Sequence, residues 1–250
     1  MDYYSRFAGV YDALMENADY SARTDYLLRL FNKFGAMPTL LLDAACGTGS
    51  FSNLFAKKGI EVIGTDISED MLCIAREKSA EEGLDVLYLC QDLKNLDLYG
   101  TVDGAICCLD SLNHITQRSS LAEALCKISL FLEDGKLFIF DVNTVYKHKC
   151  VLGNNTFAFE ENGIYCVWQN NYREKNHLVD ITLDFFVEKD DIYIRSTEKF
   201  SERAYTQDEL DKLLIEAGFR IEAIYGDMTE KPPADDCERV IYVCRKQGKK

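Results

Sequence analysis

The feature that most constrains the fold is an apolar run that ends in an acid and a glycine-rich turn. Residues 40–50 read Leu-Leu-Leu-Asp-Ala-Ala-Cys-Gly-Thr-Gly-Ser, and a stretch with helical spacing starts at Phe51. Gly47 and Gly49 allow a sharp turn, and they let a ligand lie against bare main chain where a Cβ would collide. The start of the helix adds free amide groups and the positive end of the helix dipole. The run therefore predicts a strand, a turn and a helix that bind a nucleotide-like cofactor.

The residues around this turn distinguish between two kinds of cofactor. A dinucleotide fingerprint reads Gly-x-Gly-x-x-Gly and holds a pyrophosphate at the helix N-terminus. Here Ser52 stands where the third glycine is expected, and Asp43 places an acid at the strand end. A carboxylate repels a pyrophosphate but attracts an ammonium group. An NAD(P)-linked oxidoreductase therefore remains as an alternative, but the sequence disfavours it.

The spacing of the acid and the glycines resembles the first motif of the class I S-adenosylmethionine-dependent methyltransferases, Asp/Glu-x-x-x-Gly-x-Gly. Asp43, Gly47 and Gly49 match that motif, and the resemblance covers nearly the whole chain. It implies that the cofactor is S-adenosylmethionine. It also implies that Asp43 and the turn, including Ala45 and Thr48, contact the methionine part of the cofactor. The motif is specific for the cofactor and not for the methyl acceptor.

Strands and helices alternate from residue 39 onward, which predicts an α/β fold with parallel strands joined by right-handed crossovers. The resemblance makes this a Rossmann-like, seven-stranded, mostly parallel sheet in the order 3-2-1-4-5-7-6, with helices on both faces. Asp134-Gly135 is expected to end the helix at 121–132, before the fifth strand begins at Lys136. Strands are expected at 39–43, 61–66, 85–91, 103–109, 136–142, 219–225 and 240–243, and helices at 51–58, 68–82, 121–132 and 206–217.

A pattern with a period of two replaces this alternation between residues 145 and 200. Apolar and polar side chains alternate along 179–187, which is typical of a strand with one buried face. We expect a small antiparallel β insertion of two to four strands at 145–200, within a methyltransferase core formed by 1–144 and 201–250. Its aromatic side chains either shape an acceptor pocket or form a dimer contact, and the sequence leaves the choice between monomer and dimer open.

Acids mark the ends of four successive predicted strands. Ligands of α/β proteins bind at the carboxyl ends of parallel strands, so these side chains are expected to surround one site. The resemblance implies that Asp66 accepts hydrogen bonds from the ribose hydroxyls. It implies that Asp92 accepts from the adenine amine, with Gln91 and Leu93 beside it. A helix N-cap or a loop turn is the alternative role of Asp66 and Asp92. The four acids are Asp43, Asp66, Asp92 and Asp110.

The resemblance also implies apolar contacts with the cofactor. Ile67 and Met71 would flank the adenine, and Leu109 lies in the loop after the fourth strand, which faces the methyl group in this family. A methionine on a helical stripe also fits the core, because its flexible side chain fills gaps. Both interpretations of Met71 stay open.

The amino end carries a second likeness. Tyr3-Tyr4-Ser5-Arg6-Phe7-Ala8, followed by Val10-Tyr11-Asp12, resembles the lid-like start of small bacterial methyltransferases. Tyrosines close over the sulfonium in those proteins, and aromatic faces attract cations. Tyr3 and Tyr11 are thus expected at the cofactor, with an ordinary amphipathic helix as the alternative. Arg23 is expected either to meet the cofactor carboxylate or to be an exposed helix cation.

His114 is the candidate general base. It lies in the loop after the fourth strand, and it is the only one of the three histidines near the expected site. Methyl transfer needs an aligned nucleophile and, for a protonated acceptor, a group that removes the proton. A polar loop histidine without a catalytic role is the alternative. The loop lacks the Asn/Asp-Pro-Pro-Tyr sequence of enzymes that methylate base amines, which argues against nucleic-acid bases.

Charge and cysteine usage limit the partners. The formal net charge is −14, from 42 acids against 28 lysines and arginines, which disfavours phosphate backbones. The ten cysteines form no Cys-x-x-Cys pair, so no metal site is expected, and reduced thiols suit the cytoplasm. No signal peptide or membrane-spanning run is expected. We therefore expect a cytoplasmic enzyme that methylates a small-molecule acceptor; a non-catalytic cofactor-binding protein and an RNA methyltransferase are the alternatives.

Overall fold

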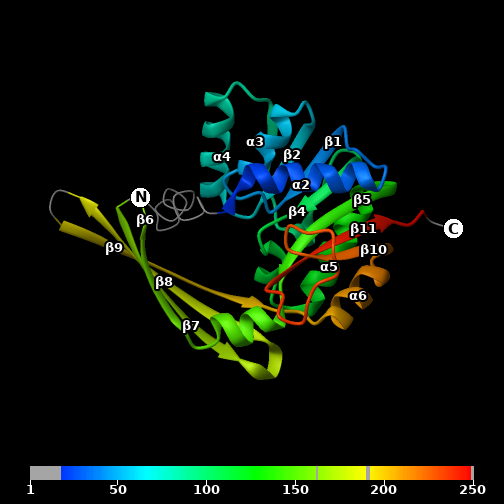
Figure 1. The fold of residues 1–250 in the computed structure, drawn as a ribbon. Coiled ribbons are helices and arrows are strands. Elements are labelled where there is room, and N and C mark those ends of the chain that lie inside the picture. Colours follow the sequence, from blue (N-terminus) through cyan, green and yellow to red (C-terminus); the bar gives the residue numbers. More distant parts are fainter. Residues whose placement is uncertain (1–17, 162, 190–191, 249–250) are drawn as a thin grey trace.

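The computed structural model describes residues 18–161, 163–189 and 192–248, and a seven-stranded sheet forms its centre (Figure 1). The strand order is β3-β2-β1-β4-β5-β11-β10. The first five strands of the core are parallel, and β11 runs antiparallel to both of its neighbours. The predicted α/β class and the order 3-2-1-4-5-7-6 are therefore confirmed. The strands are β1 (Leu40–Ala44), β2 (Glu61–Asp66), β3 (Val86–Cys90), β4 (Val102–Cys107), β5 (Leu132–Asn143), β10 (Phe219–Gly226) and β11 (Arg239–Lys246).

Helices cover both faces of this sheet (Figure 1). Neighbouring residues of a strand point to opposite faces. Leu41 packs with α2 and α3, whereas Leu42 packs with α5 and α6, and both leucines are fully buried. Burial on both faces explains why the strands read as continuous apolar runs. The helices are α2 (Tyr20–Lys33), α3 (Ser50–Lys57), α4 (Glu69–Glu81), α5 (Arg118–Phe131) and α6 (Gln207–Glu216), with short turns η2 (Leu93–Asn95), η3 (Ser111–His114), η4 (Lys147–Leu152) and η5 (Glu174–Asn176).

Capping side chains mark the starts of helices, and pairing with β4 places the start of β5 earlier than predicted. The Ser68 hydroxyl caps α4 by accepting from the backbone N–H of Met71 at 3.3 Å. The expected break at Asp134-Gly135 is wrong, because β5 begins at Leu132, immediately after α5, and includes both residues. Leu132 pairs with β4, and a register irregularity absorbs the residues that follow it. No helix in the described part of the chain is both long enough and apolar enough to cross a membrane.

The inserted segment forms a second sheet beside the core, to the left in Figure 1. Its four antiparallel strands lie at the upper end of the predicted range, and η4 precedes them where no helical turn was expected. The alternation is confirmed: Ile181 and Phe185 are buried on one face, while Asp184 pairs with Arg195 on the other. The strands are β6 (Thr156–Glu161), β7 (Ile164–Arg173), β8 (Leu178–Lys189) and β9 (Ile192–Arg203). The division into core and insertion remains a prediction.

Candidate active site

The turn after β1 is held against the end of β2 by one carboxylate. Asp66 accepts from the backbone N–H of Gly47 and from that of Ser68, each at 2.9 Å. Three residues of the turn, Ala45, Gly47 and Gly49, have positive φ angles of 57°, 55° and 74°. Positive φ is uncommon for a residue other than glycine, so the conformation of Ala45 marks a backbone that its surroundings hold in place. Asp66 thereby links the turn to the start of α4.

The two glycines of the turn have different neighbours. A Cβ on Gly47 would meet nothing within 4 Å, so this residue faces open space. A Cβ on Gly49 would lie 2.4 Å from the Tyr88 hydroxyl and 2.9 Å from the Cβ of Ala75. Close packing of α3 against β3 and α4 therefore requires glycine at position 49. Only Gly47 leaves room for a ligand on the side where its Cβ would lie.

Asp43 is buried directly below the turn. Its side chain is 1% exposed, and its carboxylate accepts from the Ser52 hydroxyl at 2.6 Å. Burial raises the pKa of Asp43 to about 7, although the hydrogen bond from Ser52 opposes this shift. The sequence marked Ser52 only as a missing glycine. The structure makes it the partner of the acid that begins the motif.

Two neighbouring hollows open along the carboxyl ends of β1, β2, β3 and β4. The narrow hollow, about 30 Å³, lies at the glycine turn; the wide one, about 310 Å³, lies over the ends of β2 and β3. Ala45 and Ser111 line both hollows, so the two adjoin each other. The narrow hollow includes the predicted residues Asp43, Ala45, Gly47, Thr48 and Leu109. The wide hollow includes Ala45, Asp66, Ile67, Gln91, Asp92, Leu93 and His114.

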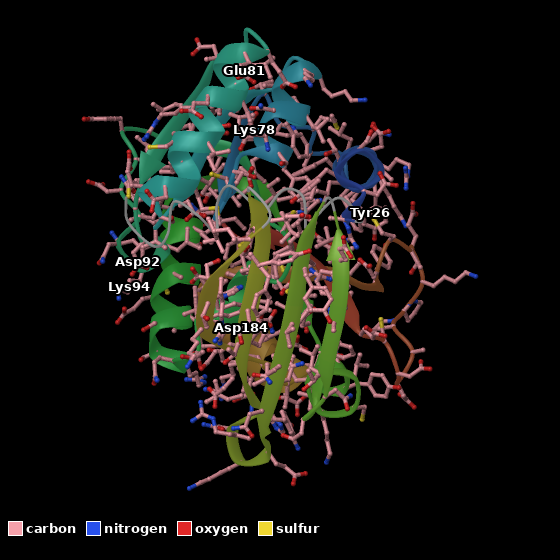
Figure 2. All side chains as sticks on the ribbon, turned by 90° about the vertical axis from the view of Figure 1, so that its left-hand side faces the viewer. Tyr26, Lys78, Glu81, Asp92, Lys94 and Asp184 are labelled. Carbon is pink, nitrogen blue, oxygen red and sulfur yellow. The ribbon has the colours of Figure 1, made fainter. Side chains whose placement is uncertain are left out.

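Asp92 and Gln91 line the wide hollow and also fix their own loop. Asp92 accepts from the backbone N–H of Lys94 at 3.1 Å, and its carboxylate lies 3.1 Å from the Lys94 ammonium (Figure 2). The Gln91 side chain makes two hydrogen bonds with the backbone of Asp97, at 3.0 and 3.1 Å. Asp92 is therefore an N-cap, as its alternative interpretation states, and its contact with adenine remains a prediction.

Five of the predicted cofactor residues do not line these hollows or lie outside the described residues, and Gly49, which packs against Tyr88, is one of them. Tyr3 and Tyr11 lie outside the described residues. Met71 is half-buried in α4 and is not among the described residues around either hollow. Arg23 makes a bidentate pair with Asp227, with both distances 2.8 Å. The Arg23 side chain is only 17% exposed, so the prediction of an exposed helix cation is wrong. The contact of Arg23 with the cofactor remains a prediction.

A buried ionic cluster holds the loop after β4, and sequence reasoning missed it. Asp141 in β5 accepts from the backbone N–H groups of Leu109 and Asp110, each at 2.7 Å, and both of these residues have positive φ. Arg239 in β11 contacts both acids, with Asp110 at 2.5 Å. Burial alone would raise the pKa of Asp110, but the charges of Arg239 and Lys147 outweigh it and lower that pKa to about 2. The only signal in the sequence was an acid within the apolar strand at 137–142.

His114 ends η3 and lines the wide hollow. Its side chain is half-exposed, and its ring lies 5.1 Å from the ring of Phe200. Its Nε2 atom is 3.7 Å from the carboxylate of Glu202, a nearly buried residue of β9. Side chains of β9 therefore contact a residue that lines the wide hollow.

Comparison with known proteins identifies this arrangement. The family model described as "Methyltransferase domain" matches residues 41–135. The Bacillus subtilis protein YqeM, which is named as a methyltransferase, is 31% identical over 244 residues, 97% of each chain. An S-adenosylmethionine-dependent methyltransferase from Clostridium acetobutylicum superposes with a TM-score of 0.90 at 31% identity, covering 99% of this chain and all of the other. This chain belongs to the class I S-adenosylmethionine-dependent methyltransferases. It is an enzyme, and S-adenosylmethionine is its cofactor.

More distant methyltransferases share the fold alone. The S-adenosylmethionine-bound structure of CalS10, an amino pentose methyltransferase from Micromonospora echinaspora, has a TM-score of 0.78 at 18% identity, and the match covers 95% of this chain and 97% of that one. The high coverage means that the inserted sheet is part of the shared architecture. The acceptors of these distant proteins do not carry over to this methyltransferase.

Proposed function

We propose that this methyltransferase transfers its methyl group to a small-molecule acceptor and that His114 removes the proton of the acceptor. One observation carries the proposal: His114 lines the same cavity of about 310 Å³ as Asp66. That cavity adjoins the hollow at the glycine turn, since Ala45 and Ser111 line both. Cofactor and acceptor thus have adjoining spaces, with a base at the wall of the wider one.

The residues of the two hollows fit S-adenosylmethionine. The narrow hollow is far smaller than the wide one, which leaves the nucleoside to the wide hollow. Asp43 lies beneath the narrow hollow for the ammonium group of the methionine part. Each carboxylate oxygen of Asp66 accepts one backbone hydrogen bond and keeps a lone pair for a ribose hydroxyl. Ile67 is 70% exposed at the wide hollow, which leaves apolar surface for the adenine. When bound, the cofactor supplies a methyl group already activated by its sulfonium.

The side chains of the protein then have two tasks. The loop after β4, fixed by Asp141, aligns the acceptor with the carbon–sulfur bond. His114 takes the proton that a hydroxyl or ammonium acceptor must lose. A half-exposed imidazole can pass this proton on to water.

Negative charge around the wide hollow limits the acceptor. Lys94 and Arg239 offset the charges of Asp92 and Asp110, but Asp66 lines the hollow and Glu202 lies 3.7 Å from His114. These carboxylates repel phosphate groups, as does the net charge of −14. A neutral or cationic small molecule fits this field better than RNA does.

A transfer assay with methyl-tritiated cofactor tests the proposal. The protein is incubated separately with the small-molecule fraction, the RNA and the protein of a cell extract. We expect label in the small-molecule fraction, and about a hundredfold slower transfer by His114→Gln, since general bases contribute at least that much. Label in RNA would contradict the small acceptor. Tight binding of S-adenosylhomocysteine with no transfer to any fraction would indicate a non-catalytic binder.

A further inference from the structure

Two histidines face one buried carboxylate at the junction of the core and the inserted sheet. Glu202 in β9 is 4% exposed. Its Oε1 atom lies 3.7 Å from Nε2 of His114, and its Oε2 atom lies 3.3 Å from Nε2 of His148 in η4. His148 is fully buried. The three side chains form a row from the wide hollow into the interior.

The partners of His148 determine where its protons lie. Its Nδ1 atom is 3.3 Å from the backbone carbonyl of His177, and a carbonyl only accepts, so Nδ1 is the donor. Its Nε2 atom has no aligned hydrogen-bond partner among the described residues, although it lies beside Glu202. The same oxygen of Glu202, Oε2, accepts from the side-chain amide of Asn143 at 3.4 Å. The other oxygen, Oε1, is the one that faces His114.

We propose that Glu202 is a positioning residue that holds His114 in the orientation needed for proton removal. This inference rests on the proposed function of His114 as the base. Glu202 faces Nε2 and leaves Nδ1 to receive the proton, as the acid of a catalytic triad orients its histidine. The distance of 3.7 Å exceeds that of a direct hydrogen bond, and such contacts often tighten only when substrates bind.

The proton and the electron pairs balance without a further reactant. The nucleophilic atom of the acceptor forms a bond to the methyl carbon, while the electron pair of the breaking carbon–sulfur bond returns to sulfur. The proton of the acceptor moves to Nδ1 of His114, and the carboxylate of Glu202 offsets the resulting positive charge. The imidazolium then loses this proton to water, because its side chain is 47% exposed.

A metal site is the competing interpretation of the same residues. Single ligand atoms of Asp110, His114 and Glu202 lie within 4.8 Å of one another. Both oxygens of Asp110 already have donors, however: Arg239 at 2.5 Å and the amide of Asn143 at 2.9 Å. A guanidinium so close to the carboxylate disfavours a second cation. The contacts therefore favour the positioning role.

The histidine rings can be observed directly, because the chain contains only three histidines. The full-length protein, labelled with nitrogen-15 in histidine and saturated with S-adenosylhomocysteine, is titrated by NMR. In Glu202→Gln we expect the pH at which the His114 ring is half protonated to fall by about one unit, as for loss of a charge within 6 Å. Glu198→Gln, on the same strand, is the matched control and leaves this midpoint unchanged. Asp66 and Asp110, the other carboxylates that act on His114, remain in both variants.

Further outcomes separate the alternatives. Glu202→Asp keeps the charge and is expected to shift the midpoint less than Glu202→Gln does, which also covers the case in which the glutamine variant folds poorly. If the His114 titration is unchanged in both Glu202→Gln and Glu202→Asp, the inference is overturned. Shifts of the His114 signals on adding zinc that a chelator reverses would also overturn it. Normal transfer by His114→Gln would instead refute the proposed base, whatever the titration shows.

Discussion

The glycine-turn end of the cavity and the His114 end are built from different kinds of contact. At the turn, Asp43 bonds Ser52 and Asp66 bonds Gly47, over 9 and 19 residues of sequence. At the other end, Asn143 and Arg239 bond Asp110 over 33 and 129 residues. The cofactor end is thus encoded in one short segment and depends mainly on backbone amides. The acceptor end depends on side chains that only the complete fold brings together.

The largest expected effect comes from a substitution at the His114 end of the cavity, where the contacts join residues far apart in the sequence. Arg239→Met leaves the buried carboxylates Asp110 and Asp141 without their cation. Removing one partner of a buried ion pair costs about 3–5 kcal/mol, which urea denaturation measures. The control is Arg76→Ala, which removes an exposed pair with Glu69 and costs less than about 1 kcal/mol. Equal losses in the two variants would mean that the buried cluster does not hold the fold.

The next effect concerns the cofactor end. Asp66→Ala removes the predicted hydrogen bonds to the ribose, each worth about 1.5–3 kcal/mol for a charged acceptor. Affinity for S-adenosylhomocysteine, measured by calorimetry, is expected to drop at least about tenfold. Asp92→Ala is the comparison, because Lys94 already occupies that carboxylate, and its loss should be smaller. An unchanged affinity in Asp66→Ala would reject the role of that residue.

The two glycines of the turn sharpen the comparison within one segment. Alanine at either position is strained by about 1–2 kcal/mol because of the positive φ. Gly49→Ala also overpacks Tyr88, which adds about 1–3 kcal/mol. Thermal unfolding should therefore show the larger loss of stability in Gly49→Ala. Cofactor affinity should fall in Gly47→Ala, where the new Cβ enters the hollow; the reverse pattern would contradict this assignment of the two glycines.

The same contrast explains what the sequence could predict. The turn, the acids at the strand ends and the sheet order were predictable, because each follows from spacing within a short segment or from the family motif. The clamp of Asp141 and Arg239 and the approach of Glu202 to His114 were not. Their partners are far apart in the sequence, and neither spacing nor propensity indicates such pairs. The sequence placed Gly49 at the ligand together with Gly47. The packing of Tyr88 against Gly49 is visible only in the structure.

The smallest expected effect is a dependence of cofactor binding on pH. Burial raises the pKa of Asp43 to about 7, and the ammonium of the cofactor should bind the ionised form. Affinity should therefore rise with pH and level off above about 7, being about fivefold weaker at pH 6 than at pH 7. Without ligand the sign is opposite: the raised pKa lowers stability as pH rises from about 4 to about 7. Calorimetry at several pH values measures the affinity, and Asp43→Asn should flatten the profile; a flat profile in the unaltered protein would contradict the contact.

A crystal structure of the complex with S-adenosylhomocysteine tests the central claim most directly. The account predicts the ribose hydroxyls within hydrogen-bond distance of Asp66, the amino-acid part at the Gly47 turn, and the sulfur facing the part of the wide hollow that His114 lines. Nucleoside density outside that hollow, or a ribose bonded to other side chains, would contradict it.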